Sequence, residues 1–312
     1  MKKLSLLLAA CLILTCVICF SSCGSSWNDG VFTYAQTYSK NDKSDATFVV
    51  KSVVDKENAV ELTIPESYDN LPVTGIDETA FDGCKKLQKI TIPASITDID
   101  PEVFDDCPAL EEVIINATSL EEAADMFLNA GSSDKTVKVK ISAGVTVIPE
   151  GMFRNCANLE ITFEPECTVK TIEKEAFKNS SLTFVELSSI ESIESEAFAG
   201  CLKLTSASLG FAEGELFFES LDSGAFTDCA NLTSVTIKNT KVTVPGNTFN
   251  GCVKLQNIDF AGAMNDWTFN TDYSKSNIGK DLPEVSTTGI FLTVTCTDGT
   301  ISYKIDGTVV KN

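Results

Sequence analysis

Apolar and polar residues alternate in short runs that recur along the chain with a period close to 23 residues. In one repeat, Ile90 and Ile92 alternate with Lys89 and Thr91, which predicts a strand with one buried face. The segment around Phe81 that precedes this strand is predicted to form a short helical or 3₁₀ turn whose apolar side points inward. Each repeat therefore predicts one tight turn and one half-buried strand.

A phenylalanine anchors every repeat, and successive anchors are separated by 23, 23, 26, 24, 21, 28 and 23 residues. The anchors are Phe81, Phe104, Phe127, Phe153, Phe177, Phe198, Phe226 and Phe249. Six of them have Cys three positions later and Leu six positions later, whereas Ala130 and Ser180 replace the Cys in the other two. A unit of this length is too small to bury its own apolar face and must stack on its neighbours. The pattern predicts a right-handed repeat solenoid of about eight ~23-residue units with a parallel β-sheet.

The repeats, which span residues 64–262, are flanked by segments with another pattern. Apolar and β-branched runs in residues 31–63 predict a β-rich N-terminal cap, which a solenoid needs because its first strand would otherwise be an open edge. In residues 263–312, Asp298 and Gly299 lie between two alternating runs and predict a β-hairpin. This segment is therefore expected to be a C-terminal β-hairpin cap.

The N-terminus combines two lysines, a long apolar run and small residues, a pattern typical of an export signal in residues 1–22. Cys23 directly follows two serines and resembles the acylated cysteine of a bacterial lipobox. We therefore expect cleavage before Cys23, acylation of its sulfur and a polar tether in residues 23–30. The alternatives are an ordinary secretory leader or an uncleaved membrane anchor. The segment predicts an extracytoplasmic protein that is lipid-anchored to a membrane.

Composition narrows the chemistry that this chain can perform. It has 44 acidic and 24 basic residues, a formal charge of −20, which disfavours nucleic acid and anionic lipid as partners. It contains no histidine, which removes Ser-His-Asp and Cys-His pairs and the common His-bearing zinc sites. Carboxylate acid–base chemistry stays open, but the spacing selects no pair of acids. We expect no cofactor, no metal and no catalytic residue.

The repeat cysteines and one acid-rich stretch could each suggest a special site. Side chains at the same place in successive units lie parallel, so the cysteines are predicted to form a ladder of buried thiols, with disulfides or a metal site as the alternative. Cys167 and Cys296 lie off this ladder, and their state is open. The acids between Asp98 and Glu112 could suggest calcium, but they are spread over a loop and a turn. A solvated edge is the favoured interpretation.

With these repeats, the chain resembles the BspA-like leucine-rich repeat family of bacterial surface proteins. The similarity covers about residues 60–260 through the pattern A-F-x-x-C-x-x-L. It extends to Leu71–Ile76 at the entrance, and to Trp267 and Val294–Gly299 at the exit. The resemblance implies a leucine-rich repeat solenoid on secreted or surface-anchored proteins associated with adhesion to host proteins and other bacteria. It implies no catalytic residues, and it does not identify a ligand for this chain, because the ligand varies within the family.

Outward-facing strand positions define the face that a partner could contact. The candidate partner-binding residues are Lys89, Thr91, Glu112, Ile114, Thr162, Phe184, Glu186 and Thr236. Ile114 and Phe184 are the apolar exceptions, so each is either a contact point or packed under a neighbouring loop. We predict a surface-anchored protein that binds a host matrix or bacterial surface protein. A glycan, suggested by Phe184 and Trp267 as exposed aromatics, is the alternative ligand, and a carboxylate-based hydrolase is less favoured.

Overall fold

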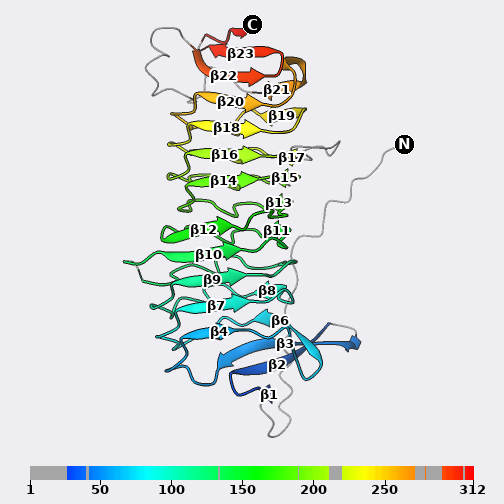
Figure 1. Cartoon of the computed structure of the whole chain (residues 1–312), viewed down its shortest axis with the longest axis vertical. Coiled ribbons are helices and arrows are strands. Elements are labelled where there is room, and N and C mark those ends of the chain that lie inside the picture. Colours follow the sequence, from blue (N-terminus) through cyan, green and yellow to red (C-terminus); the bar gives the residue numbers. More distant parts are fainter. Residues whose placement is uncertain are drawn as a thin grey trace, which may run out of the picture.

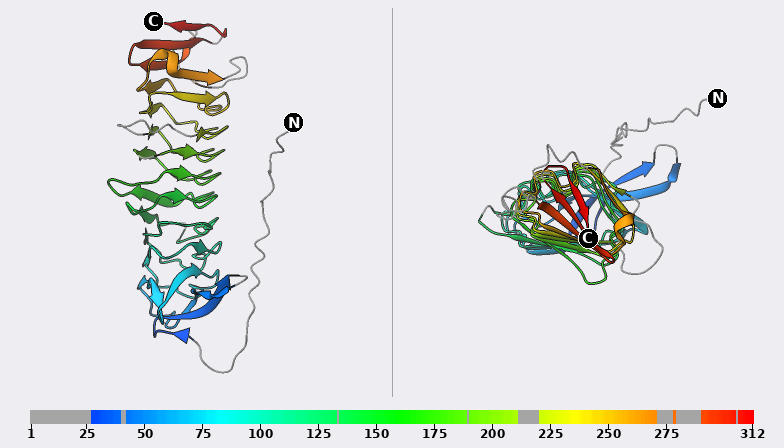
Figure 2. Two further views of the ribbon diagram at one scale, coloured as in Figure 1. Left: turned by 90° about the vertical axis from the view of Figure 1, so that its right-hand side faces the viewer. Right: turned by 90° about the horizontal axis from the view of Figure 1, so that it is seen from above.

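The computed structural model describes residues 27–39, 42–132, 134–188, 190–210, 220–270, 278, 290–304 and 306–312. The predicted signal segment, Cys23 and the first part of the tether lie outside the described residues. The chain forms an elongated solenoid whose coils stack along one axis, with its two caps at opposite ends (Figure 1). Viewed along this axis, successive coils superpose and their walls surround a common interior (Figure 2). The predicted repeat solenoid with parallel strands is confirmed.

One strand from each coil contributes to a wall that we call the broad face. Its first sheet has the order β12-β10-β9-β7-β4 and its second has the order β14-β16-β18-β20-β22-β23-β24. The strands of the first sheet are β4 (Glu61–Thr63), β7 (Lys89–Ile92), β9 (Glu112–Ile115), β10 (Val137–Ile141) and β12 (Leu159–Phe163). Those of the second sheet are β14 (Phe184–Leu187), β16 (Ser206–Leu209), β18 (Ser234–Ile237), β20 (Asn257–Phe260), β22 (Ile290–Cys296), β23 (Gly299–Lys304) and β24 (Val309–Lys311). Strand residues alternate between buried and more accessible, as their alternating sequence predicts.

Shorter strands form a second wall. They are β8 (Asp98–Ile99), β11 (Val147–Ile148), β13 (Thr171–Ile172), β15 (Ser192–Ile193), β17 (Ser220–Leu221), β19 (Val242–Pro245) and β21 (Trp267–Asn270). The strands β11, β13, β15 and β17 pair in parallel as one uninterrupted sheet, and β19 pairs with β21. Each of these strands contributes a buried apolar residue such as Ile148 or Ile172 to the interior.

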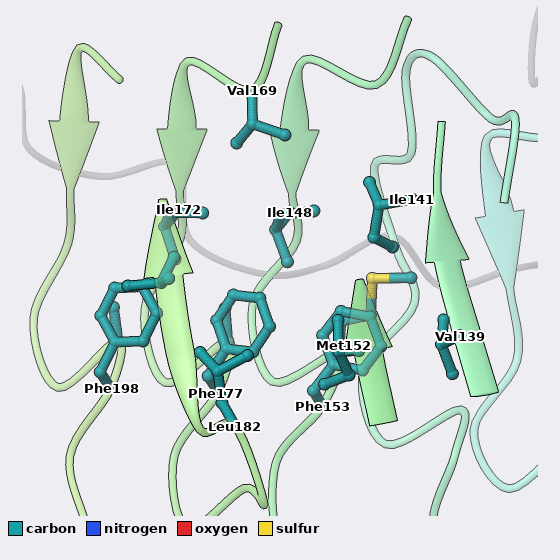
Figure 3. Close-up of a cluster of buried hydrophobic side chains, with 14 of the residues drawn as sticks. Val139, Ile141, Ile148, Met152, Phe153, Val169, Ile172, Phe177, Leu182 and Phe198 are labelled. Carbon is teal, nitrogen blue, oxygen red and sulfur yellow. The ribbon is translucent and has the colours of Figure 1, made fainter. Parts of the chain in front are cut away.

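The anchor phenylalanines form a column inside the solenoid. All eight side chains are at most 1% exposed, and successive rings are separated by centroid distances of 5.4, 5.6, 5.3, 5.0, 5.2, 4.9 and 5.6 Å. Figure 3 shows Phe153, Phe177 and Phe198 side by side, with Ile148 and Ile172 of the second wall above them. Burial of large apolar side chains is the main stabilising term in folding, so this column joins the coils into one core.

The turns that carry these phenylalanines differ from the helical or 3₁₀ segment that the sequence predicts. They contain i to i+3 hydrogen bonds, for example from the Cys84 N–H to the Phe81 C=O at 3.0 Å. However, the backbone enters the left-handed region two residues before the anchor in Glu102, Asp125 and Glu175. A left-handed residue interrupts a right-handed helix. The only helical segment in the described part of the chain is η1 (Met264–Asp266).

The repeat cysteines form the predicted ladder of buried thiols. The Cys201 thiol donates to the Phe177 C=O at 3.0 Å, and the Cys229 thiol donates to the Phe198 C=O at 3.1 Å, so each bonds to the preceding coil. Cys167 and Cys296 are also free and buried. Burial raises the pKa of the Cys107 thiol to about 12. These thiols therefore serve as small packing groups.

Each end of the solenoid carries additional β-structure. The N-terminal sheet has the order β1-β2-β3-β6-β5. Its strands are β1 (Trp27–Asn28), β2 (Phe32–Ser39), β3 (Asp42–Val53), β5 (Ser67–Tyr68) and β6 (Leu71–Ile76). At the other end, β22 and β23 form the predicted antiparallel hairpin, and β24 pairs with β23. These additions cover the ends of the core with paired strands.

Candidate binding face

Outward residues of the broad face form two columns along the solenoid. The strand registers place the first column at Glu61, Lys89, Glu112, Lys138 and Glu160, and then at Phe184, Ser206, Ser234, Asn257 and Thr293. The second column contains Thr63, Thr91, Ile114, Lys140 and Thr162, and then Glu186, Ser208, Thr236, Asp259 and Thr295. All eight residues singled out from the sequence therefore lie in these columns, spread over five strands.

The first half of the broad face holds charges that are paired with each other. The Glu112 carboxylate lies 2.7 Å from the Lys89 Nζ, and it also pairs with the ammonium of Lys140. The hydrogen bonds from Lys140 and then Lys89 lower the pKa of Glu112 below its ordinary value. Thr91 and Ile114 are half-buried in the adjacent column. Lys89, Glu112 and Lys140 are therefore neutralised by each other, whereas Glu61, Lys138 and Glu160 have no ion pair among the described residues.

The second half is rich in hydroxyl and amide side chains, and one aromatic ring rises from it. Phe184 is 59% exposed, whereas Thr236 is half-buried. Glu186 is exposed and lies 3.5 Å from the Lys238 Nζ. Among the described residues between β4 and β24, only Phe184 and Leu202 are exposed large hydrophobic residues. Phe184 is on a strand of the broad face and Leu202 is in a turn, so Phe184 is the exposed apolar side chain of this face.

The two halves meet at a break between β12 and β14, which we call the seam. Each of these strands ends its own sheet, and no ladder joins them. Figure 1 shows them farther apart than other neighbouring strands of the broad face. The sequence pattern does not predict the seam. Ile161 and Val185 both follow their anchor phenylalanines by eight residues, and Ala207, which follows its anchor by nine, still pairs with Val185.

The structure corrects the prediction that Trp267 is an exposed aromatic. Its side chain is 6% exposed and packs against Phe260 and Phe269. Its indole N–H donates to the Tyr303 hydroxyl at 2.9 Å. A buried indole with a satisfied N–H is a typical core group. Trp267 therefore holds β21 against the C-terminal strands, and Phe184 is the exposed aromatic of the pair.

The acid-rich stretch that could suggest calcium separates into contacts between coils. Asp100 accepts a hydrogen bond from the Glu78 N–H at 3.1 Å, and Glu111 pairs with Lys135 at 2.9 Å. Asp106 pairs with Lys85. Within the described ranges, no group of three or more Asp, Glu or Cys side chains is arranged to hold a metal ion. The carboxylates of Asp100, Asp106 and Glu111 therefore connect neighbouring coils.

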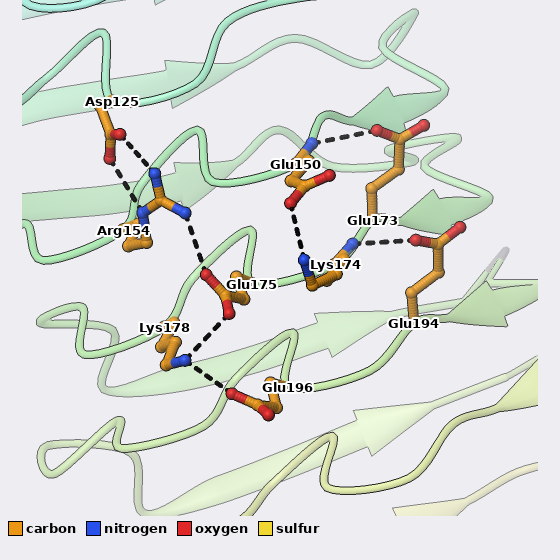
Figure 4. Close-up of polar contacts among 9 residues, drawn as sticks. All are labelled: Asp125, Glu150, Arg154, Glu173, Lys174, Glu175, Lys178, Glu194 and Glu196. Carbon is orange, nitrogen blue, oxygen red and sulfur yellow. Dashed lines mark hydrogen bonds and ion pairs between the residues drawn. The ribbon is translucent and has the colours of Figure 1, made fainter. Parts of the chain in front are cut away.

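A longer ion ladder follows the edge beside the phenylalanine turns (Figure 4). The Arg154 guanidinium pairs with Asp125 of the preceding coil and lies 2.9 Å from Glu175 of the next. Lys178 continues the ladder from Glu175 at 3.0 Å to Glu196 at 2.6 Å. The carboxylates stand two residues before their anchors, and Gly151 occupies that place between Asp125 and Glu175.

Gly151 makes room for the guanidinium in this ladder. A Cβ at this position would lie 3.2 Å from the Arg154 Cζ, and the backbone φ is +64°. Both the space and the left-handed backbone therefore favour glycine here. The ladder alternates charge across four coils, so it stabilises the stacking of the coils and leaves little unpaired charge for a ligand.

No helix in the described portion is both long and apolar enough to span a membrane.

Comparison with known proteins identifies the repeat. The model of the BspA type leucine rich repeat region matches residues 55–182 and 170–280. No curated protein matches the chain. Among solved structures, a leucine-rich repeat protein from Bacteroides ovatus is 21% identical with a TM-score of 0.37, covering 73% of this chain and 70% of its own. A leucine rich cell surface protein from Faecalibacterium prausnitzii is 20% identical with a TM-score of 0.32, covering 81% and 99%.

These structural likenesses are too low to carry an argument of their own, so the assignment rests on the repeat model. Its two matched segments overlap and together cover residues 55–280, well over half of the chain. They contain all eight anchor phenylalanines and the strands of the broad face from β4 to β20. The chain therefore belongs to the BspA type leucine-rich repeat family.

Proposed function

We propose that this chain is a surface-anchored, non-enzymatic binding protein that engages a protein partner through the broad face. The observation that carries the proposal is the placement of Phe184, an exposed aromatic ring in a flat array of polar side chains. Aromatic residues dominate the energetics of protein interfaces when polar groups surround them. The candidate contact residues are the eight outward positions from Lys89 to Thr236 given above. Phe184 is expected to make the largest contribution to the binding free energy.

Two further observations support binding over catalysis. The sequence has no histidine, so it offers no imidazole as a general base. Several carboxylates have cationic partners, Glu112 on the face and Glu175 on the edge among them. A paired carboxylate of lowered pKa stays ionised and is a poor proton donor at neutral pH.

The cell surface is the proposed location. The supporting observations are the export signal in residues 1–22 and the lipobox-like Cys23. Membrane attachment would then come from the acyl chains on Cys23, since one chain binds only marginally and two anchor stably.

A pull-down with the mature ectodomain against host matrix and bacterial surface proteins tests the binding proposal. Phe184→Ser should weaken capture of the partner by about tenfold or more, because hot-spot truncations cost about 2 kcal/mol. Leu202→Ser is the matched control for loss of an equally exposed apolar group in a turn. A partner that binds both variants as tightly as it binds the wild type would contradict the proposed face.

A glycan is the second candidate ligand. It is favoured by the polar side chains that follow Phe184 along its column, with Ser206 on the adjacent strand and Ser234 on the next, since a sugar ring can stack on an aromatic face while its hydroxyls bond to polar groups. Because Trp267 is buried, only one of the two aromatics expected for this function is accessible. Binding of the wild type, but not of Phe184→Ser, on a glycan array would decide for this alternative.

Anchoring has its own test. Cys23→Ala should release soluble protein or leave an unprocessed precursor, while the isolated solenoid keeps its binding activity. Mass spectrometry of the mature N-terminus would identify the acyl group. A Cys23→Ala chain that remains on the membrane with its leader cut elsewhere would contradict acylation at this cysteine.

A further inference from the structure

The seam is a local fault in an otherwise continuous stack. The phenylalanine column passes it without a break, with Phe153 and Phe177 separated by 5.0 Å between ring centroids. The second wall also continues, because Thr171 pairs in parallel with both neighbouring strands. The break is confined to the broad face, where no ladder joins β12 to β14. Two strand edges that run in the same direction therefore face each other there.

Backbone groups point into the seam from both edges. The Leu187 C=O accepts from the Gly210 N–H at 3.1 Å, so this part of β14 bonds to β16. Successive residues of a strand direct their backbone groups to opposite sides, which turns those of Phe184 and Glu186 toward the seam. On β12, the Glu164 N–H bonds to the preceding strand at 2.9 Å, so the groups of Ile161 turn to the seam.

A side-chain hydrogen bond closes part of this gap. The Ser181 hydroxyl donates to the Leu159 C=O, and the Ser181 N–H donates to the Cys156 C=O at 2.9 Å. These bonds lie at the beginning of the strands. Farther along, the backbone groups of Ile161 and Glu186 have no hydrogen-bond partner among the described residues. Unpaired strand edges are templates for another strand.

The inner side of the seam is apolar. Phe163 ends β12 half-buried, with its ring 6.4 Å from that of Phe177 in the next coil. Leu182 is buried beside Phe177 (Figure 3). Phe184 follows on the outer side at the start of β14. A strand in the seam would therefore place apolar side chains inward, against Phe163 and Leu182.

The outer side of the seam is acidic. Glu160 and Glu186 are both exposed, and Glu160 has no ion-pair partner within the described part of the chain. On the other edge of β12, Lys138 stands directly opposite Glu160 in the ladder. That neighbouring strand, β10, reads Val-Lys-Val-Lys-Ile. Alternating apolar and basic residues thus already match the β12 edge within this protein.

We propose that the seam accepts an extended segment of a protein partner as an added parallel strand that pairs with β12 and β14. The segment would alternate apolar residues, facing Phe163 and Leu182, with basic residues, facing Glu160 and Glu186. The inferred strand insertion rests on the proposed binding function and specifies its partner. It would join the two sheets of the broad face into one, with main-chain hydrogen bonds supplying affinity and side chains supplying specificity.

A peptide with the sequence of residues 136–142 (Thr-Val-Lys-Val-Lys-Ile-Ser) is the probe, because it carries this alternation. Fluorescence anisotropy of the labelled peptide, titrated with the whole mature ectodomain, should show saturable binding that weakens as salt is added. The control peptide Thr-Val-Glu-Val-Glu-Ile-Ser has the same apolar residues and reversed charge. It should not bind, since like charges directly opposite each other are destabilising.

Two variants locate the bound peptide. Glu186→Pro removes an N–H that points into the seam and leaves the β14–β16 ladder intact, because proline is tolerated on an edge whose N–H is unpaired. It should weaken peptide binding by about tenfold or more. Glu160→Gln should weaken it by about threefold, and Asp259→Gln, which removes a carboxylate elsewhere on the face, should leave it unchanged.

Hydrogen exchange provides an independent measurement. In the free protein, the Glu186 amide should exchange faster than the Ser208 amide, and saturation with the peptide should protect it. A slowly exchanging Glu186 amide in the free protein, or equal binding of both peptides, would overturn the inference. If a natural partner bound Glu186→Pro but no longer bound Phe184→Ser, the binding face would be upheld and strand insertion would be overturned.

Discussion

The phenylalanine column and the broad face are built by the same units, yet one is continuous and the other is interrupted. Between Phe153 and Phe177 the rings stack at 5.0 Å, and between Phe177 and Phe198 at 5.2 Å. At the same level β12 and β14 fail to pair. The anchors in these units are separated by 24 and 21 residues. β14 pairs with β16 across the shorter spacing, so the break is specific to the level between β12 and β14.

The difference follows from how each wall is positioned. A phenylalanine ring is set by a tight turn with its own hydrogen bonds, such as that from the Ser180 N–H to the Phe177 C=O at 2.9 Å. A strand is held by its ladders to neighbouring strands, and here β12 pairs with β10 while β14 pairs with β16. The connection from the anchor to the strand has the same length in β12 and β14, so the break does not follow from connection length. The break lies on the face that is available to a partner.

The largest expected effect comes from breaking the column at the level of the seam. Phe177→Ala should lower the free energy of unfolding by about 3–5 kcal/mol, because it leaves a cavity between two stacked rings. Phe184→Ala, in the same unit, should change it by about 0.5 kcal/mol or less, because that ring is largely exposed. Guanidinium denaturation monitored by circular dichroism measures both. If both variants lost the same free energy of unfolding, the Phe184 side chain would also contribute to the core.

A smaller effect is expected from breaking the ion ladder that joins the coils at this level. Arg154→Met keeps the length of the side chain but leaves Asp125 and Glu175 without their shared cation. The loss should be about 1 kcal/mol, since the guanidinium is partly exposed and water screens the charges. Thermal unfolding at low and high salt measures it. A loss that does not shrink in high salt would point to packing of the side chain instead.

The smallest expected effect compares two carboxylates on one turn. The ammonium of Lys178 and the guanidinium of Arg154 lower the pKa of Glu175, so its stabilising contribution is present above the ordinary value of 4.5 and is lost as pH falls through the lowered pKa. Burial raises the pKa of Glu173, so the folded state binds its proton more tightly and stability falls as pH rises through that higher window.

The two substitutions should therefore have opposite signs at pH 7. Glu175→Gln should destabilise the protein and flatten its loss of stability in acid. Glu173→Gln should be neutral or stabilising at pH 7. In the wild type the Glu150 N–H donates to the Glu173 carboxylate at 3.0 Å, and the amide oxygen of glutamine can still accept this hydrogen bond. Urea denaturation from pH 3 to pH 8 gives both profiles. Profiles of the same sign would contradict the assignment of burial as the cause for Glu173.

The sequence was sufficient to predict most of the fold. Alternation at Ile90 and Ile92 predicted a half-buried strand, and the structure has it in β7. The spacing of Cys201 from Phe198 predicted a buried thiol. Of the candidate site, the outward position of Phe184 was predicted, and its exposure agrees. Whether this residue contacts a partner stays a prediction.

What the sequence by itself determined are features that repeat in every unit, namely the buried phenylalanine, the thiol and the alternating strand. A local pattern suffices for them because each unit meets the same neighbours above and below. Only the tertiary structure decided the burial of Trp267 against Tyr303, the bridging of two coils by Arg154 and the seam between β12 and β14. These depend on which residues of different coils come together. A one-dimensional pattern does not contain this relation.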